Sequence, residues 1–146
     1  MTDARLNFGK AYPAGKKALA DFDGALADPG VDKSLGHLIK IRASQVNGCA
    51  LCIDMHTKEA KDDGETDRRI HLLNAWRETE LFTEEERAAL ALTEAVTLIA
   101  DGHVPDDVFA DAKKHFDDET LGKIVMAIIS INAWNRLGIV QGMPIK

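Results

Sequence analysis

The chain has 146 residues, of which 45% are hydrophobic, and a formal net charge of −6. This length and apolar content predict one domain, residues 1–146, with a hydrophobic core of its own. Because acidic and basic residues are mixed along an acidic chain, we expect no nucleic-acid-binding surface and no attraction to anionic membranes.

Helical periodicity runs through almost the whole chain, and no alternating strand pattern with hairpin turns appears. The fold class we predict is therefore all-α, a single-domain helical bundle. The first dozen residues are expected to be an irregular arm. Turn and capping residues divide the rest into predicted helices at 13–27, 32–45, 49–62, 66–76, 83–100, 105–116 and 119–140.

The last predicted helix, 119–140, is apolar around nearly its whole circumference. Such a helix must be buried on several sides, so we expect it in the core or between subunits. Its charged and amide residues, Lys123 and Asn132 among them, argue against a membrane span. The N-terminal sequence has no apolar stretch of signal-peptide length, and we expect a cytoplasmic protein.

The chain has two cysteines, Cys49 and Cys52, and His56 follows four residues after the second. One helix would place the three side chains on a single face. The dipeptide at 47–48, Asn-Gly, predicts a helix end and restart, which puts both cysteines in the first turn of a new helix. There the free backbone N–H groups favour thiolate over thiol.

Two thiols with a nearby base can attack a peroxide or a disulfide and then form a disulfide of their own. In a reducing compartment, such a pair is more often catalytic or metal-binding than a structural disulfide. Buried cysteines without chemistry remain an alternative. So does zinc bound by Cys49, Cys52 and His56 with His37 as a fourth ligand, although no second cysteine pair is present. The Ile53 that follows Cys52 excludes c-type haem attachment, which needs histidine there.

Residues 37–60 carry a more specific signature, Ser-Gln-x-Asn-Gly followed directly by Cys-x-x-Cys-x-x-x-His. This segment resembles the core of the alkylhydroperoxidase D-like branch of the carboxymuconolactone decarboxylase family. The segment Ile-Asn-Ala-Trp-Asn-Arg-Leu at 131–137 is similar to that family's last helix. The resemblance implies an all-α subunit that binds no cofactor and assembles into a homo-oligomer, a trimer or hexamer. It also implies reduction of a hydroperoxide substrate by electrons from an external dithiol, such as a lipoyl group on a partner protein.

Carried over residue by residue, the resemblance makes Cys52 the peroxidatic cysteine, Cys49 the resolving cysteine and His56 part of a proton relay. His37 stands at the relay position where the family usually has glutamate, twelve residues before the first cysteine. A histidine there can pass a proton but orients His56 less well than a carboxylate does. Glu59 shares a helix face with His56, but we expect it to be a solvated surface charge.

Two other functions remain open for the sequence. One is lactone decarboxylation, as in the other branch of the family, which does not use a cysteine pair. The other is a redox-sensing oligomer that forms the disulfide between Cys49 and Cys52 without efficient turnover, which the departure at His37 favours.

Overall fold

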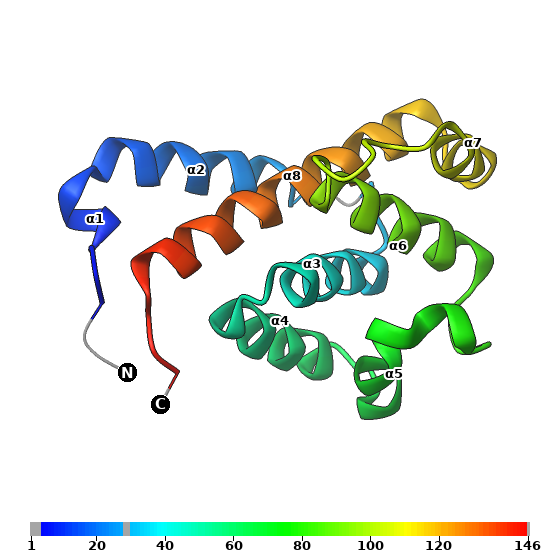
Figure 1. Cartoon of the computed structure of the whole chain (residues 1–146), viewed down its shortest axis with the longest axis horizontal. Helices are drawn as coiled ribbons and strands as arrows, with labels where there is room; N and C mark the ends of the chain where they lie inside the picture. The colour runs from blue at the N-terminus through cyan, green and yellow to red at the C-terminus, as the bar shows by residue number, and fades with distance from the viewer. Residues whose placement is uncertain (1–3, 28–29, 146) are drawn as a thin grey trace.

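A computed structural model describes residues 4–27 and 30–145, and these residues form a bundle of helices without a strand (Figure 1). The predicted all-α fold is thereby confirmed. The helices are α1 (Phe8–Ala11), α2 (Pro13–Ala25), α3 (Lys33–Asn47), α4 (Ala50–Asp62), α5 (Asp67–Leu72), the 3₁₀ helix η1 (Leu73–Glu78), α6 (Glu84–Thr97), α7 (Asp106–His115) and α8 (Asp118–Gln141).

Two local predictions were wrong. The expected irregular arm contains the short helix α1, whose N-cap Asn7 accepts a hydrogen bond from the backbone N–H of Lys10 at 3.1 Å. Asparagine is among the best N-cap residues, so the signal was present in the sequence. The helix expected at 66–76 is two segments, because the backbone at Leu72 leaves helical geometry (φ −95°, ψ 2°) and the chain continues as the 3₁₀ helix η1.

Helix α3 is the central element of the bundle. Leu35 and Ile39 pack in one apolar cluster with residues of α6, α7 and α8, whereas Leu38 and Ile41 pack in another with residues of α4, α5, η1 and α6. These four side chains are 6% exposed or less. Helical spacing directs the two pairs to different sides, so α3 is covered on both and holds α4 and α8 in place.

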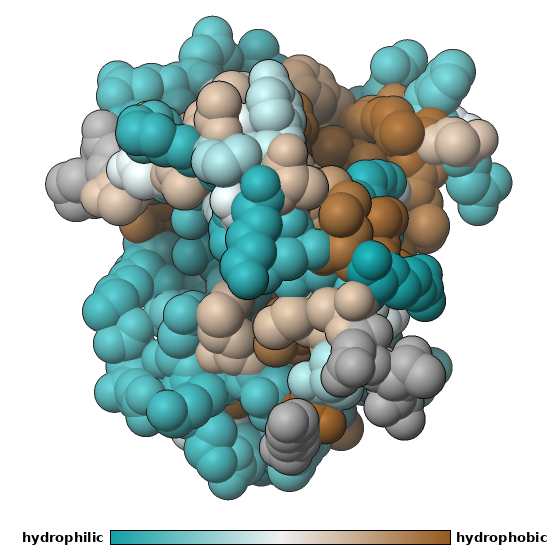
Figure 2. Space-filling view, turned by 90° about the vertical axis from the view of Figure 1, so that its left-hand side faces the viewer, coloured by the Kyte–Doolittle hydropathy of each residue, from teal (hydrophilic) through white to brown (hydrophobic). Residues whose placement is uncertain are grey.

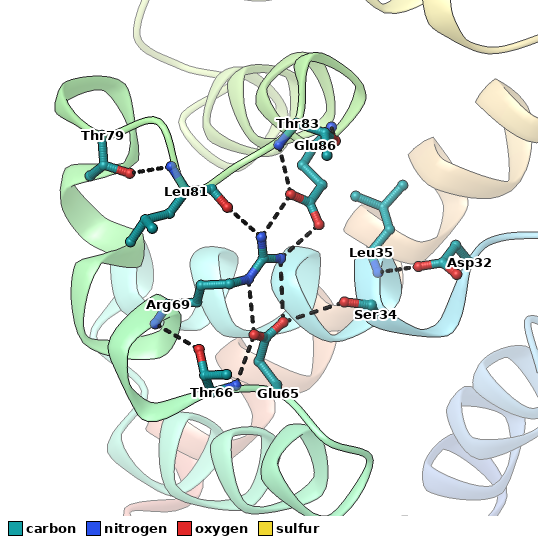
Figure 3. Close-up of polar contacts among 10 residues, drawn as sticks. All are labelled: Asp32, Ser34, Leu35, Glu65, Thr66, Arg69, Thr79, Leu81, Thr83 and Glu86. Carbon is teal, nitrogen blue, oxygen red and sulfur yellow. Dashed lines mark hydrogen bonds and ion pairs between the residues drawn. The ribbon is translucent and has the colours of Figure 1, made fainter.

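Polar side chains fix the short helix α5 between its neighbours (Figure 3). The Arg69 guanidinium donates to a carboxylate oxygen of Glu65 at 2.9 Å and to one of Glu86 at 2.7 Å. Glu86 also accepts from the backbone N–H of Thr83 at 2.9 Å, which completes a capping box at the start of α6. The predicted helix start at Thr83 is therefore tied to α5 through one arginine.

Helix α8 is long and apolar enough to cross a membrane by length and composition, although only 33% of its most apolar window is buried. In the bundle its side chains Leu121, Ile124 and Ile128 pack in the first apolar cluster, which makes it a core helix. Helix α2 lies alongside α8 and runs in the opposite direction (Figure 1). None of the residues of α2 is fully buried, so α2 covers α8 without entering the core.

Candidate functional site

The turn between α3 and α4 places both cysteines. Gly48 adopts the left-handed conformation (φ 68°, ψ 32°) and ends α3, as the Asn-Gly pair predicts. The backbone N–H of Cys49 donates a hydrogen bond to the carbonyl oxygen of Ser44 at 3.0 Å. Cys49 is then the N-cap of α4 and Cys52 lies in its first turn, at the positive end of the helix dipole.

A network of amide side chains, in which Asn47 is partly buried and Asn135 fully buried, holds this turn against α8. The side-chain N–H group of Asn47 donates to the amide oxygen of Asn132 at 2.9 Å and to that of Asn135 at 3.0 Å. The Asn135 amide in turn donates to the Ser44 hydroxyl at 3.0 Å, and Asn135 is fully buried. The two signature segments, 37–60 and 131–137, are therefore one hydrogen-bonded unit, a contact that sequence alone did not reveal.

Cys49 and Cys52 form a disulfide, and their side chains are 2% and 5% exposed. Only Cys52 lines the adjoining cavity. Helix α8 passes close to the two sulfurs at Gly138, because a Cβ atom there would lie 3.4 Å from the Cys49 Sγ and 3.7 Å from the Cys52 Sγ. Because residue 138 is glycine, no side chain of that residue lies between α8 and the two sulfurs.

His56 also lines the cavity, and Glu59 orients its ring. The Nδ1 atom lies 2.8 Å from a carboxylate oxygen of Glu59. Because a carboxylate only accepts hydrogen bonds, Nδ1 carries the proton and Nε2 keeps its lone pair. Glu59 is about half exposed, as expected for a surface charge, but its carboxylate also contacts the His56 ring, which was not expected.

Burial lowers the pKa of His56 below its usual 6.5, although the hydrogen bond and negative charge of Glu59 oppose that shift. Lys40 lowers the pKa further and Asp23 raises it, each through its charge. At neutral pH the ring is therefore uncharged, which is the form that accepts a proton.

His37 lies apart from the other three predicted site residues. Its Nε2 atom is 2.6 Å from a carboxylate oxygen of Asp63, the C-cap residue of α4. Asp63 follows Cys52 by eleven residues, about 16 Å along the helix axis. His37 does not line the cavity, so the structure brings together Cys49, Cys52 and His56 but not His37. Within residues 4–27 and 30–145, no three His, Cys, Asp or Glu side chains are grouped as metal ligands.

The cavity has a volume of about 390 Å³ and lies between α2, α3, α4 and α8. Lys16 and Asp23 from α2 and Lys40 from α3 contribute its charged groups. Sequence reasoning missed them because no local motif indicates how α2 and α3 pack beside the cysteines. The wall is otherwise largely apolar, formed by Leu51, Met55, Ile131, Trp134, Leu137 and Met143.

Comparisons with known proteins agree with this fold and signature. The model of the carboxymuconolactone decarboxylase family matches residues 13–95. The uncharacterized protein YdfG of Bacillus subtilis is 41% identical over 138 residues, 94% of each chain. A crystal structure of an Agrobacterium tumefaciens protein of unknown function, suggested to be an antioxidant defence protein AhpD, is 42% identical with a TM-score of 0.93, over 99% of this chain and 100% of that chain.

More distant relatives share part of the chain or the fold alone. The alkyl hydroperoxide reductase AhpD of Maricaulis maris is 44% identical over 45 residues, 31% of this chain and 26% of that protein. The debrominase Bmp8 is 20% identical with a TM-score of 0.84, over 95% of this chain and 74% of that chain. From the family match, the extensive identity to YdfG and the Cys-x-x-Cys site on an all-α bundle, the chain belongs to the alkylhydroperoxidase D-like branch of the carboxymuconolactone decarboxylase family.

Proposed function

We propose that the protein is a thiol-dependent hydroperoxide reductase. One observation carries the proposal: Cys52, rather than Cys49, lines the cavity together with His56. The His56 ring is uncharged, and its Nδ1 atom is held by Glu59. This is the arrangement of a nucleophile, a base and an orienting carboxylate. The names of the AhpD relatives support the same activity.

The first step in the reduced protein is formation of the Cys52 thiolate. The Nε2 atom of His56 accepts the thiol proton, and the N-terminal end of α4 stabilises the negative sulfur. The thiolate attacks one peroxide oxygen, the O–O bond breaks, and the alcohol leaves with the proton held by His56. Cys52 is then a sulfenic acid.

The second step uses the thiol of Cys49, which is already within bonding distance of Cys52. Its sulfur attacks the sulfur of the sulfenic acid, and the hydroxyl group leaves with the thiol proton as water. One hydroperoxide and two thiols thus give one alcohol, one water and one disulfide. An external dithiol, such as a lipoyl group on a partner protein, returns two electrons and two protons.

Steady-state consumption of tert-butyl hydroperoxide with dihydrolipoamide as donor tests the proposal. Turnover is expected in the wild type and should fall at least about 100-fold in His56→Gln, since general base catalysis contributes roughly 10²–10⁴-fold. Cys52→Ser and Cys49→Ser should both abolish it. Full turnover in Cys52→Ser would contradict the mechanism. If the wild type forms the disulfide with peroxide but none of the dithiols tried supports turnover, the protein would be a redox sensor instead.

The predicted role of His37 in the proton relay is tested with two variants. His37→Ala removes the ring that contacts Asp63, and His37→Glu restores the glutamate usual in the family. If His37 acts in the relay, turnover falls in the first variant and rises in the second. Unchanged rates in both variants would limit the relay to His56 and Glu59.

A further inference from the structure

The cavity is far larger than hydrogen peroxide requires. A water molecule occupies about 30 Å³ in the liquid, and hydrogen peroxide is only one oxygen atom larger. The volume of about 390 Å³ instead lies in the range of roughly 300–1,000 Å³ that is typical of organic ligands. The apolar wall indicates a substrate with an apolar body.

The charged groups of the cavity are unusual for so acidic a chain. Two ammonium groups, Lys16 and Lys40, line it against one carboxylate, Asp23, while the whole chain has a formal charge of −6. The Asp23 carboxylate accepts a hydrogen bond from the Ser130 hydroxyl at 2.9 Å. Lys16 is exposed, whereas Lys40 is partly buried, and no acidic side chain of the described residues forms an ion pair with Lys40. A partly desolvated cation attracts an anion more strongly than an exposed one does.

The cation and the sulfurs lie at different places along α8. The sulfurs are against Gly138, whereas Asp23 is bound to Ser130, eight residues earlier and about 12 Å along the helix axis. Lys40 lies eight residues before Gly48, about 12 Å along the axis of α3 from the turn that carries the cysteines. Between the two ends the wall of α8 presents Trp134 and other apolar side chains.

We propose that the cavity binds an organic hydroperoxide that also carries a carboxylate, such as an oxidised fatty acid, with the carboxylate on Lys40. The hydroperoxide group reaches Cys52, and the apolar chain between the two groups lies along α8. This inference rests on the proposed function for its chemistry, but the binding of a carboxylate does not require turnover.

The test compares a medium-chain fatty-acid hydroperoxide with its methyl ester, which differs only in the charge of the head group. In the wild type we expect kcat/KM to be at least about tenfold higher for the acid, the ratio that roughly 1.4 kcal/mol gives. Lys40→Met should reduce the ratio to near one by raising KM for the acid alone, and Lys40→Arg should keep it. The control Lys58→Met, exposed on α4 and outside the cavity wall, should behave as the wild type.

A second readout separates this proposal from the peroxidase mechanism. Calorimetric binding of octanoate and methyl octanoate involves no peroxide, and octanoate should bind the wild type at least tenfold more tightly and lose that advantage in Lys40→Met. Selective octanoate binding without turnover would sustain the cavity proposal and overturn the proposed function. Equal kcat/KM for acid and ester in the wild type would contradict the carboxylate site. An equal loss for both substrates in Lys40→Met would also contradict the carboxylate site, because Lys40 would then influence the reaction only through the charge of His56.

Discussion

At the scale of single residues, the contact between His56 and Glu59 decides which nitrogen can take a proton. The His56 side chain is 9% exposed, and its burial is the largest influence on the pKa of His56, which is lowered although Glu59 opposes the shift. Protonation of a buried imidazole costs free energy, because the charged ring is removed from water. Its contribution to folding stability is therefore present above pH 6.5 and is lost as the pH falls through the lowered pKa of the folded state.

Glu59→Gln removes the charge that raises the pKa of His56, so the pKa should fall further. We expect the acid limb of the rate profile for hydroperoxide reduction to move to lower pH. The maximal rate should fall as well, since His56 becomes a weaker base. Turnover measured from pH 4.5 to 8 checks this, with Asp62→Asn on the exposed side of α4 as the control. An acid limb that moves to higher pH would contradict the assignment.

We expect the residue at position 138 to limit access to the sulfurs, because α8 passes close to them there. The methyl group of Gly138→Ala lies at ordinary contact distances from both sulfur atoms, and alanine stabilises a helix interior by about 0.5–1 kcal/mol relative to glycine. This variant should melt higher and keep most of its turnover. Gly138→Leu should lower the rate at which iodoacetamide alkylates reduced Cys52 by at least about tenfold, because its side chain extends into the cavity wall. Equal alkylation rates in the two variants would show that α8 does not limit access.

At the scale of elements, the link between the α3–α4 turn and α8 explains why Ser-Gln-x-Asn-Gly precedes the cysteines. Ser44 and Asn47 bond to the amides of α8, and Gly48 supplies the left-handed residue. The resemblance identified both segments. Their contact was not predictable because it joins residues about ninety positions apart. Helical periodicity indicates which residues share a face of one helix, but not which helices pack together.

Asn135→Ala should therefore destabilise the turn as well as the fold. It leaves the buried Ser44 hydroxyl without its donor and removes one acceptor from Asn47, which costs about 1–3 kcal/mol for an unpaired buried group. Urea unfolding measures the loss of free energy, and the exposed Asn74→Ala is the matched control. A change under roughly 0.5 kcal/mol, the range of ordinary surface substitutions, would refute the structural role of the network.

At the scale of the whole molecule, local sequence signals predicted the helices of the bundle, whereas contacts between distant helices were not predicted. Caps such as Thr83 and the spacing of the cysteines depend on neighbouring residues, so the helices and the position of Cys52 followed from sequence. The partner of His37 and the place of Lys40 in the cavity depend on how separate helices pack. Charge and periodicity do not fix that packing.

The exposed apolar face of α8 bears on the predicted homo-oligomer. Ile129 and Ile139 are 44% and 41% exposed, and Figure 2 shows hydrophobic surface gathered at the upper right of one face of the molecule. We expect sedimentation velocity to give a mass three or six times the 16.0 kDa of one chain. Ile129→Lys should weaken the assembly, whereas Phe109→Lys on α7, at similar exposure, should not. A monomer at micromolar concentration would contradict this prediction.

The reaction of the reduced protein with one equivalent of alkyl hydroperoxide, followed by mass spectrometry, shows which cysteine is the nucleophile. In the wild type we expect one alcohol released and one disulfide between Cys49 and Cys52. Cys49→Ser should stop at a sulfenic acid on Cys52, which dimedone traps, and Cys52→Ser should not react. Oxidation of Cys49 in Cys52→Ser at the wild-type rate would contradict the account, because the nucleophile would then not be the cysteine that faces the cavity.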